Sequence, residues 1–308
     1  MGEMRIFITG ANGFVGKNLL NKLVNLNNFE IHTLTRKPFK LKNETNHNFD
    51  ITDKVILETT FKDIKPDVVI HLAAAGVKYG EGSLDSIFKV NSFSGINMLE
   101  ISKKLNLSPK FIIAGSGFEY KPKSTPSKET DCLNPLSVYG ISKATQSLLL
   151  KRYDKNFNIF LLRFFSLYGV GESKHRFFPY IISESIKGNE INLTGCEQVR
   201  DYLYIDDAVD VIIKLINKKE EKGFFDFNVA SGKEITLKEI VEVIQRNLKK
   251  RGFNSKINFG VLPYREDEPM YYVADITKIK KYINWTPKVS IEEGINKMIE
   301  EELYGNKR

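Results

Sequence analysis

Short apolar runs alternate with longer stretches of helical periodicity through the first half of the chain. The apolar runs predict strands at residues 5–9, 30–35, 67–72, 110–114 and 158–164. Apolar residues at helical spacing predict helices at residues 14–26, 85–105 and 137–153. Because parallel neighbours need a crossover connection, strands separated by helices predict β–α–β units and a parallel sheet. The runs show little polar alternation, which is typical of strands covered on both faces.

The pattern loosens after about residue 168, where shorter strand candidates mix with helices. The strand candidates lie at residues 190–193, 224–229 and 256–259, and the helices at 205–217, 236–248 and 291–302. Because the chain shows neither an internal repeat nor a long linker, we expect two interleaved parts. They are a first domain of residues 1–165 and a smaller C-terminal substrate lobe of residues 166–308, with segments near 200–230 returning to the first domain.

The composition narrows the class of protein. Hydrophobic residues make up 42% and charged residues 27% of the 308, a balance that excludes a disordered or collagen-like chain. No apolar stretch approaches the ~18 residues of a membrane helix, and the start lacks the layout of a signal peptide. Cys132 and Cys196 form no CxxC pair and the four histidines show no ligand spacing, so we expect no metal site. We therefore expect a cytoplasmic protein without a membrane segment.

The charge balance is basic. Lys plus Arg number 46 and Asp plus Glu 38, which gives a formal net charge of +8. Such an excess suits an anionic partner, for example a nucleotide. The basic residues are scattered and no recognition module accompanies them, so we do not expect nucleic acid as a partner.

A glycine-rich segment, Gly10-Ala11-Asn12-Gly13-Phe14-Val15-Gly16, lies between the first predicted strand and the first predicted helix. In that context the first glycines allow a tight turn and a close backbone approach to a pyrophosphate, and the last lets helix and strand pack. The alternative is a strand-to-helix turn without a ligand. We favour dinucleotide binding, and with it a Rossmann-type α/β fold built on a doubly wound parallel sheet.

The second predicted strand ends in Thr35-Arg36-Lys37, without the acidic residue that usually binds the ribose of NAD. Arg36 would suit a 2′-phosphate through a bidentate contact, so the sequence favours NADP over NAD. The alternative is that these two cations are merely solvated. Asp50 would either accept a hydrogen bond from the adenine amino group or cap the next helix.

Tyr139 and Lys143 lie four residues apart on a predicted helix and therefore share one face. A free tyrosine has a pKa of ~10, and a neighbouring ammonium is expected to lower the pKa of Tyr139 toward a range useful for proton transfer. Ser116 follows the fourth predicted strand, where open parallel sheets bind ligands. A half-buried tyrosine beside a solvated lysine is the alternative, but the three residues together predict an acid–base site.

With these motifs the sequence resembles the extended short-chain dehydrogenases/reductases, in the NAD-dependent epimerase/dehydratase group that acts on nucleotide sugars. The matching segments run along almost the whole chain: GANGFVG at 10–16, FDITD at 49–53, HLAA at 71–74, VN at 90–91, YGISK at 139–143, LRFFSLYG at 162–169, RDYLYIDD at 200–207 and REDEPMYYVADITK at 265–278.

The resemblance implies Ser116, Tyr139 and Lys143 as the catalytic residues. The cofactor-binding residues that it implies are Gly10, Asn12, Gly13, Phe14, Val15, Gly16, Arg36, Asp50, Ile51, Leu72, Ala73, Ala74, Asn91, Tyr139, Lys143 and Phe165. The substrate-binding residues that it implies are Ser116, Tyr139, Phe178, Arg200 and Arg265.

Some of these residues have an alternative interpretation. Arg200 and Arg265 match positions that grip a nucleotide diphosphate, the alternative being surface ion pairs with Asp201 or Glu266. Phe178 suits core packing as readily as substrate contact. The resemblance also implies a homodimer, formed through the helices at residues 85–105 and 137–153.

Departures from the family pattern bear on the reaction. Family 4,6-dehydratases carry Asp-Glu directly after the catalytic hydroxyl, where this chain has Gly117 and Phe118, and 3,5-epimerase/reductases place a Cys at the second of these positions. Of the reactions that the resemblance implies, hydride transfer at C4 of the sugar is the one that these residues still allow. We favour reduction of a 4-keto-6-deoxy nucleotide sugar, since parts of the chain resemble reductases that make CDP-abequose or dTDP-fucose. A nucleotide-sugar 4-epimerase with retained NAD is the alternative, and a non-catalytic dinucleotide sensor is a third.

Overall fold

A parallel sheet forms the centre of the molecule in this computed structural model, which describes residues 3–26, 28–37, 44–76, 82–265 and 268–305. Among these residues the sheet has seven strands, every pairing of which is parallel. Their spatial order is β11 (Gly223–Val229), β6 (Asn158–Phe164), β5 (Lys110–Ser116), β4 (Val68–His71), β1 (Met4–Thr9), β2 (Phe29–Thr35) and β3 (Thr45–Asn48).

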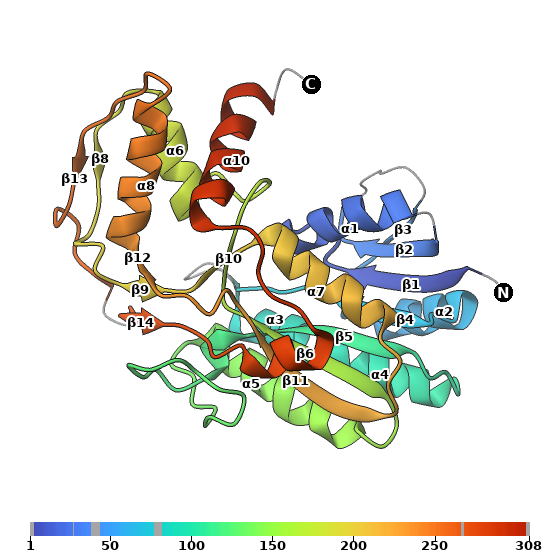
Figure 1. Ribbon diagram of the computed structural model, residues 1–308. Helices are drawn as coiled ribbons and strands as arrows, with labels where there is room; N and C mark the ends of the chain where they lie inside the picture. The colour runs from blue at the N-terminus through green and yellow to red at the C-terminus, as the bar shows by residue number, and fades with distance from the viewer. Residues whose placement is uncertain (1–2, 27, 38–43, 77–81, 266–267, 306–308) are drawn as a thin grey trace.

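Helices cover both faces of the sheet (Figure 1). In β1, Ile6 and Ile8 belong to one hydrophobic core while Phe7 belongs to the other, because successive side chains of a strand point to opposite faces. The first core is covered by α1 (Phe14–Leu26) and α7 (Ile205–Asn217). The second is covered by α2 (Lys54–Ile64), α4 (Ser94–Lys104) and α5 (Val138–Leu150). The doubly wound Rossmann-type fold is confirmed.

The predicted helix at residues 85–105 is interrupted. It consists of α3 (Leu84–Phe88), a π-helical turn η1 (Lys89–Phe93) and α4. A π turn inserts an extra residue and re-aims the side chains that follow, and such turns are frequent at functional sites. Here the turn contains Asn91, which is fully buried.

The chain after β6 forms a second lobe around short strands. Its helices are α6 (Phe177–Ile186), α8 (Leu237–Lys249) and α10 (Ile291–Tyr304). Its strands are β7 (Ser166–Tyr168), β8 (Ile191–Asn192), β9 (Val199–Arg200), β10 (Tyr202–Tyr204), β12 (Ile235–Thr236), β13 (Ile257–Asn258) and β14 (Tyr271–Tyr272). Between them, α7 and β11 return to the central sheet, where β11 pairs with β6. The helix α9 (Thr277–Ile283) also packs against β11 and α7 at the central sheet.

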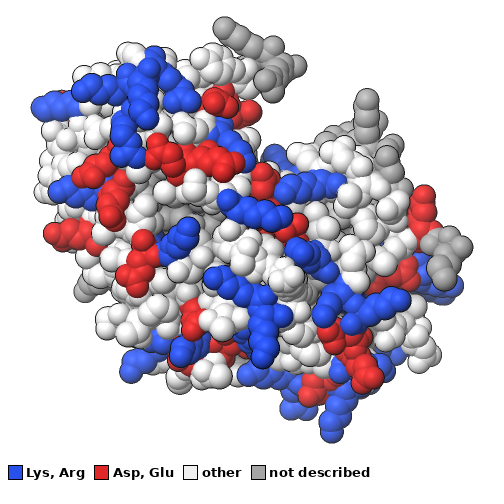
Figure 2. Space-filling view, in the orientation of Figure 1, with Lys and Arg blue, Asp and Glu red and all other residues white. Residues whose placement is uncertain are grey.

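The surface mixes both signs of charge. Figure 2 shows basic side chains beside acidic ones across the face drawn. Several surface charges form ion pairs, for example Arg246 with Glu292 at 2.6 Å. Among the helices of the described residues, none has the length and apolar character needed to cross a membrane.

Candidate active site

The glycine-rich segment forms a tight turn between β1 and α1, against the end of β4. Gly10 has φ +72°, and a Cβ built there would lie 2.6 Å from the nitrogen of Ala73. A Cβ on Gly16 would lie 2.3 Å from the carbonyl oxygen of Gly10. Side chains at these positions would fill the turn, so the glycines leave a bare backbone cradle at the N-terminus of α1. Such a cradle fits a pyrophosphate.

His71 lies beside this cradle, fully buried at the end of β4. Its Nδ1 shares a hydrogen bond with Oγ1 of Thr9 at 2.7 Å, and its Nε2 shares one with Oγ of Ser94 at 2.9 Å. Burial, with a smaller contribution from the charge of Lys143, lowers the pKa of His71 to about 3. The ring is therefore neutral, and it ties β1 to α4.

Arg36 directly follows β2, and Asp50 lies in the turn after β3, the neighbouring strand of the sheet. Hydrogen bonds from the amide and hydroxyl of Thr52, with a contribution from the charge of Arg36, lower the pKa of Asp50. The alternative that Asp50 caps the next helix is wrong, because Asp53 caps α2 by accepting from the amides of Val55 and Ile56.

The three predicted catalytic residues come from two adjoining elements. Ser116 is the last residue of β5, and Tyr139 and Lys143 lie on α5, whose first turn is capped by Ser137. A Cβ on Gly140 would lie 2.4 Å from the carbonyl oxygen of Phe118, so α5 packs directly on the turn that follows Ser116. The side chain of Ser116 interacts with the hydroxyl of Tyr139 and favours its ionised form, which opposes the rise in pKa that burial causes.

Lys143 is not the partner of Tyr139 that the spacing predicted. Its ammonium donates to the carbonyl oxygen of Ala114 at 2.6 Å and to Oε1 of Gln146 at 3.2 Å. Burial lowers the pKa of Lys143 to about 8. The pKa of Tyr139 is raised to about 12, chiefly by burial, so the expected lowering is wrong for this structure. Desolvation of the phenolate outweighs the effects that favour it.

Asn91 links the catalytic helix to the loop after β4. Its amide nitrogen donates to the carbonyl oxygen of Ala75 and to Oγ of Ser142, each at 2.9 Å. Its amide oxygen accepts from the nitrogen of Ala75 at 2.8 Å. The π turn therefore places this side chain where it supports α5 next to Lys143.

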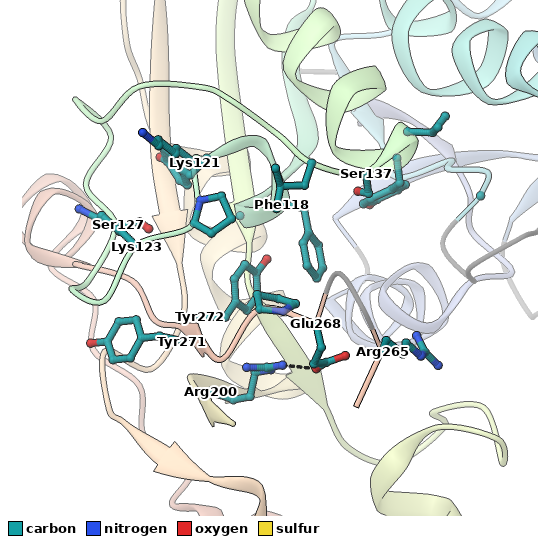
Figure 3. Close-up of a pocket in the computed structure, with 18 of the residues that line it drawn as sticks. Phe118, Lys121, Lys123, Ser127, Ser137, Arg200, Arg265, Glu268, Tyr271 and Tyr272 are labelled. Atoms are coloured by element: carbon teal, nitrogen blue, oxygen red, sulfur yellow. Dashed lines mark hydrogen bonds and ion pairs between the residues drawn. The ribbon is translucent and has the colours of Figure 1, made fainter. Parts of the chain in front are cut away.

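A cavity of about 730 Å³ opens beside these residues. Its lining includes Tyr139, Phe118, Tyr272, Arg200 and Arg265. Figure 3 shows Phe118 and Tyr272 meeting in the middle of the view, with Arg200 and its contact to Glu268 below them. The cavity thus joins Tyr139, one of the three predicted catalytic residues, to the two predicted diphosphate-binding arginines.

Tyr272 was missed by the sequence reasoning. Its hydroxyl lies close to the side chain of Ser116, and its ring stacks on Phe118 with a centroid distance of 4.6 Å. Phe118 in turn meets Tyr139 edge-on at 6.5 Å. The only sequence signal was the position of Tyr272 inside the segment at residues 265–278, and that segment did not single it out.

Arg200 is largely buried and forms an ion pair with Glu268. Asp201, the alternative partner, faces the other way. It is fully buried and accepts from the amide and hydroxyl of Ser231 and from the amide of Gly232. Arg265 is exposed at the cavity, while Glu266, its proposed partner, lies outside the described residues.

Two phenylalanines in the predicted lists lie in packed surroundings. Phe178 is 1% exposed, stacks on Tyr168 at 4.6 Å and meets Tyr202 edge-on at 4.9 Å. Its packing favours the core role over substrate contact. Phe165 lies under Tyr272 at a centroid distance of 4.7 Å.

The sheet, its helices and the glycine turn define a Rossmann-type α/β protein. The chain belongs to the NAD-dependent epimerase/dehydratase family, whose model matches residues 6–230. It is 30% identical to a UDP-glucuronate 4-epimerase of Thermodesulfobacterium geofontis, over 95% of this chain and 94% of that one. It is 28% identical to a CDP-abequose synthase of Salmonella muenchen, over 96% and 97%.

A solved structure agrees with this assignment. The chain superposes with a TM-score of 0.86 and 25% identity on a UDP-glucuronic acid 4-epimerase from Bacillus cereus in complex with UDP-glucuronic acid and NAD. The match covers 98% of this chain and all of that one. The family is NAD-dependent, and the neighbour holds NAD.

Proposed function

We propose that this protein transfers hydride at C4 of a nucleotide-activated sugar, and that its reaction is the reduction of a 4-keto-6-deoxy nucleotide sugar in deoxysugar synthesis. One observation carries the proposal. Tyr139, whose hydroxyl interacts with the side chain of Ser116, lines a cavity together with Arg200 and Arg265. Proton transfer and diphosphate binding are therefore available within one site.

The chain's own residues account for the proton steps. Bound between the turn at Gly10–Gly16 and Lys143, a reduced nicotinamide dinucleotide would supply the hydride. Tyr139 is protonated at neutral pH, because its pKa is about 12, and it donates its proton to the oxygen at C4 as the alkoxide forms. Ser116 would donate a hydrogen bond to the same oxygen, and the ammonium of Lys143 would hold the ribose hydroxyls of the cofactor.

Phe118 argues against elimination of water. Its ring is 43% exposed, lines the cavity and has no group that can transfer a proton. The nearest carboxylate in sequence, Glu119, is fully buried and paired with Arg163. The residues beside Ser116 therefore support hydride transfer without a separate acid and base.

A 4-epimerase is the second candidate, favoured by the similarity to the UDP-glucuronate 4-epimerase. It would use Ser116 and Tyr139 in both directions, with the sugar turned between two hydride transfers and NAD retained. A non-catalytic sensor would not require Tyr139 to line the cavity next to Ser116.

The cofactor preference rests on Arg36. The family is NAD-dependent. We propose that this chain prefers NADP, because no acidic residue stands at the end of β2 and the guanidinium of Arg36 is exposed there.

We also propose a homodimer. Exposed apolar side chains on α5, namely Val138, Ile141 and Leu148, would be covered by a second copy of the helix. Sedimentation velocity of the purified protein checks this proposal: a single species with the mass of a monomer would contradict it.

The first test follows nicotinamide absorbance while the protein is mixed with 4-keto-6-deoxy nucleotide sugars and NADPH or NADH. Loss of one reduced cofactor per product supports the ketoreductase, and Tyr139→Phe is the control that should abolish the loss. If no cofactor is consumed while UDP-glucuronic acid is epimerised and NAD is recovered from the denatured protein, the 4-epimerase replaces the reductase.

A further inference from the structure

We infer that Glu119 is a positioning residue, a buried carboxylate that fixes Ser116 and the catalytic helix α5 relative to each other and acts electrostatically on Lys143. This inference rests on the proposed function, because it assigns Ser116, Tyr139 and Lys143 their roles. The sequence reasoning passed over Glu119, which lies in the short 3-10 turn η2 (Gly117–Glu119) directly after β5.

Glu119 connects three elements through its two carboxylate oxygens. Its Oε1 accepts from the backbone nitrogen of Ser116 at 2.8 Å. Its Oε2 accepts from Oγ of Ser147 at 2.6 Å and from Nε of Arg163 at 2.8 Å. Ser147 lies one turn beyond Lys143 on α5, so the carboxylate binds β5 and the lysine-bearing face of α5 at once.

The charge of Glu119 is compensated by a chain of ion pairs that leads away from the site. Arg163, 1% exposed, contacts Asp226 of β11 at 2.7 Å, and Lys278 of α9 contacts the other oxygen of Asp226 at 2.7 Å. A buried charge is costly unless it is paired and hydrogen-bonded. Here both oxygens of the fully buried carboxylate have hydrogen-bond partners, and one of these partners is the guanidinium of Arg163.

This anion acts on the catalytic groups. Burial lowers the pKa of Lys143, and the charge of Glu119 opposes that lowering. The other titratable groups near Lys143 are His71 of β4, which is neutral, and Tyr139 of α5. Around Glu119 lie Arg163 of β6, Tyr120 after the turn, and Tyr272 of β14. Removing its charge therefore lets Lys143 lose its proton at lower pH.

The test measures NADH affinity by fluorescence between pH 6 and pH 10, together with kcat and KM at each pH. A cation that binds the cofactor ribose supports affinity below its pKa and loses this effect above it. In Glu119→Gln we expect the alkaline loss of NADH affinity to move down by roughly one pH unit. We also expect kcat to fall roughly 10–100-fold, with little change in KM, since Ser116 and α5 are less well placed.

Two further variants separate charge, position and folding. Ser147→Ala keeps the charge but removes the contact with α5, so it should lower kcat without moving the alkaline loss of affinity. Glu119→Gln removes one of the two carboxylates that pair with the buried Arg163, so it can lower stability. The double variant Glu119→Gln/Arg163→Met removes both charges and is the version to measure if the single variant does not fold.

An unchanged pH profile of NADH affinity in a folded Glu119 variant would overturn the electrostatic role, and an unchanged kcat would overturn the positioning role. The affinity measurement needs no sugar. A wild-type protein that binds NADH but reduces and epimerises no nucleotide sugar would therefore contradict the proposed function while leaving the role of Glu119 testable.

Discussion

The glycine turn predicts a specific loss of stability for Gly10→Ala. Two effects act at this position: φ is +72°, and an added Cβ would lie 2.6–2.9 Å from backbone atoms of Leu72 and Ala73. Both residues directly follow β4, the middle strand of the sheet, so their backbones cannot move away freely. The turn therefore has no way to accommodate a methyl group without opening.

Gly188 serves as a control that separates the backbone effect from the steric effect. Gly188 has φ +75° with nothing within 4 Å of an added Cβ, so Gly188→Ala measures the backbone cost alone. That cost is about 1–2 kcal/mol for an L-residue in the left-handed region. Overpacking of a tight interior adds about 1–3 kcal/mol, so we expect Gly10→Ala to lower the free energy of unfolding by about 2–5 kcal/mol.

Urea unfolding of the wild type and both variants, followed by circular dichroism, measures these differences. NADH titrations of the folded proteins report on the cradle, and Gly10→Ala should weaken binding at least tenfold while Gly188→Ala leaves it unchanged. If Gly10→Ala is no less stable than Gly188→Ala and binds NADH normally, the close backbone approach at this turn does not exist in solution.

Three other substitutions test separate parts of the molecule. Tyr139→Phe should lower kcat by at least 100-fold with little change in stability, and a variant that keeps its rate would remove the phenol from the mechanism. Arg36→Ala should raise the KM for NADPH about tenfold and leave that for NADH unchanged; equal effects on both would show that Arg36 does not select the cofactor. Asp201→Ala leaves the buried donors of Ser231 and Gly232 unpaired and should lower the free energy of unfolding by about 3–5 kcal/mol, measured in urea.

Elements with strong apolar patterns could be predicted from the sequence. The helix expected at residues 14–26 is α1, the strand expected at 158–164 is β6, and the helix expected at 205–217 is α7, each at the predicted bounds. By contrast β3 was missed, because its sequence TNHN has no apolar run. It is an edge strand that pairs with β2 through its backbone, and backbone pairing leaves no mark on the sequence.

The sequence predicted which residues compose the candidate site, but it did not predict the pKa values of Tyr139 and Lys143. The spacing of Tyr139 and Lys143 places both on one face of α5, but it carries no information on burial, which decides the pKa of each. Tyr272 reaches Ser116 from β14, more than 150 residues away in the sequence. Such a contact depends on how the second lobe packs on the first, and no local pattern encodes it.

Gly117 limits which reactions this turn can support. In the family, dehydratases carry Asp-Glu at the positions of Gly117 and Phe118, so the double variant Gly117→Asp/Phe118→Glu would seem to supply the missing acid and base. A Cβ at position 117, however, would lie 2.6 Å from the hydroxyl of Tyr272 and 2.8 Å from the ring of Phe165.

That ring is itself held under Tyr272, so an aspartate cannot enter without displacing two aromatic side chains. We therefore expect the double variant to lose stability and to form no 4-keto-6-deoxy sugar from a nucleotide hexose, as measured by product chromatography. The triple variant with Tyr272→Ala should recover part of the stability. Dehydration by the double variant would show that reaction type depends on residues 117 and 118 alone, whereas we argue that the aromatic layer of Phe165 and Tyr272 restricts it as well.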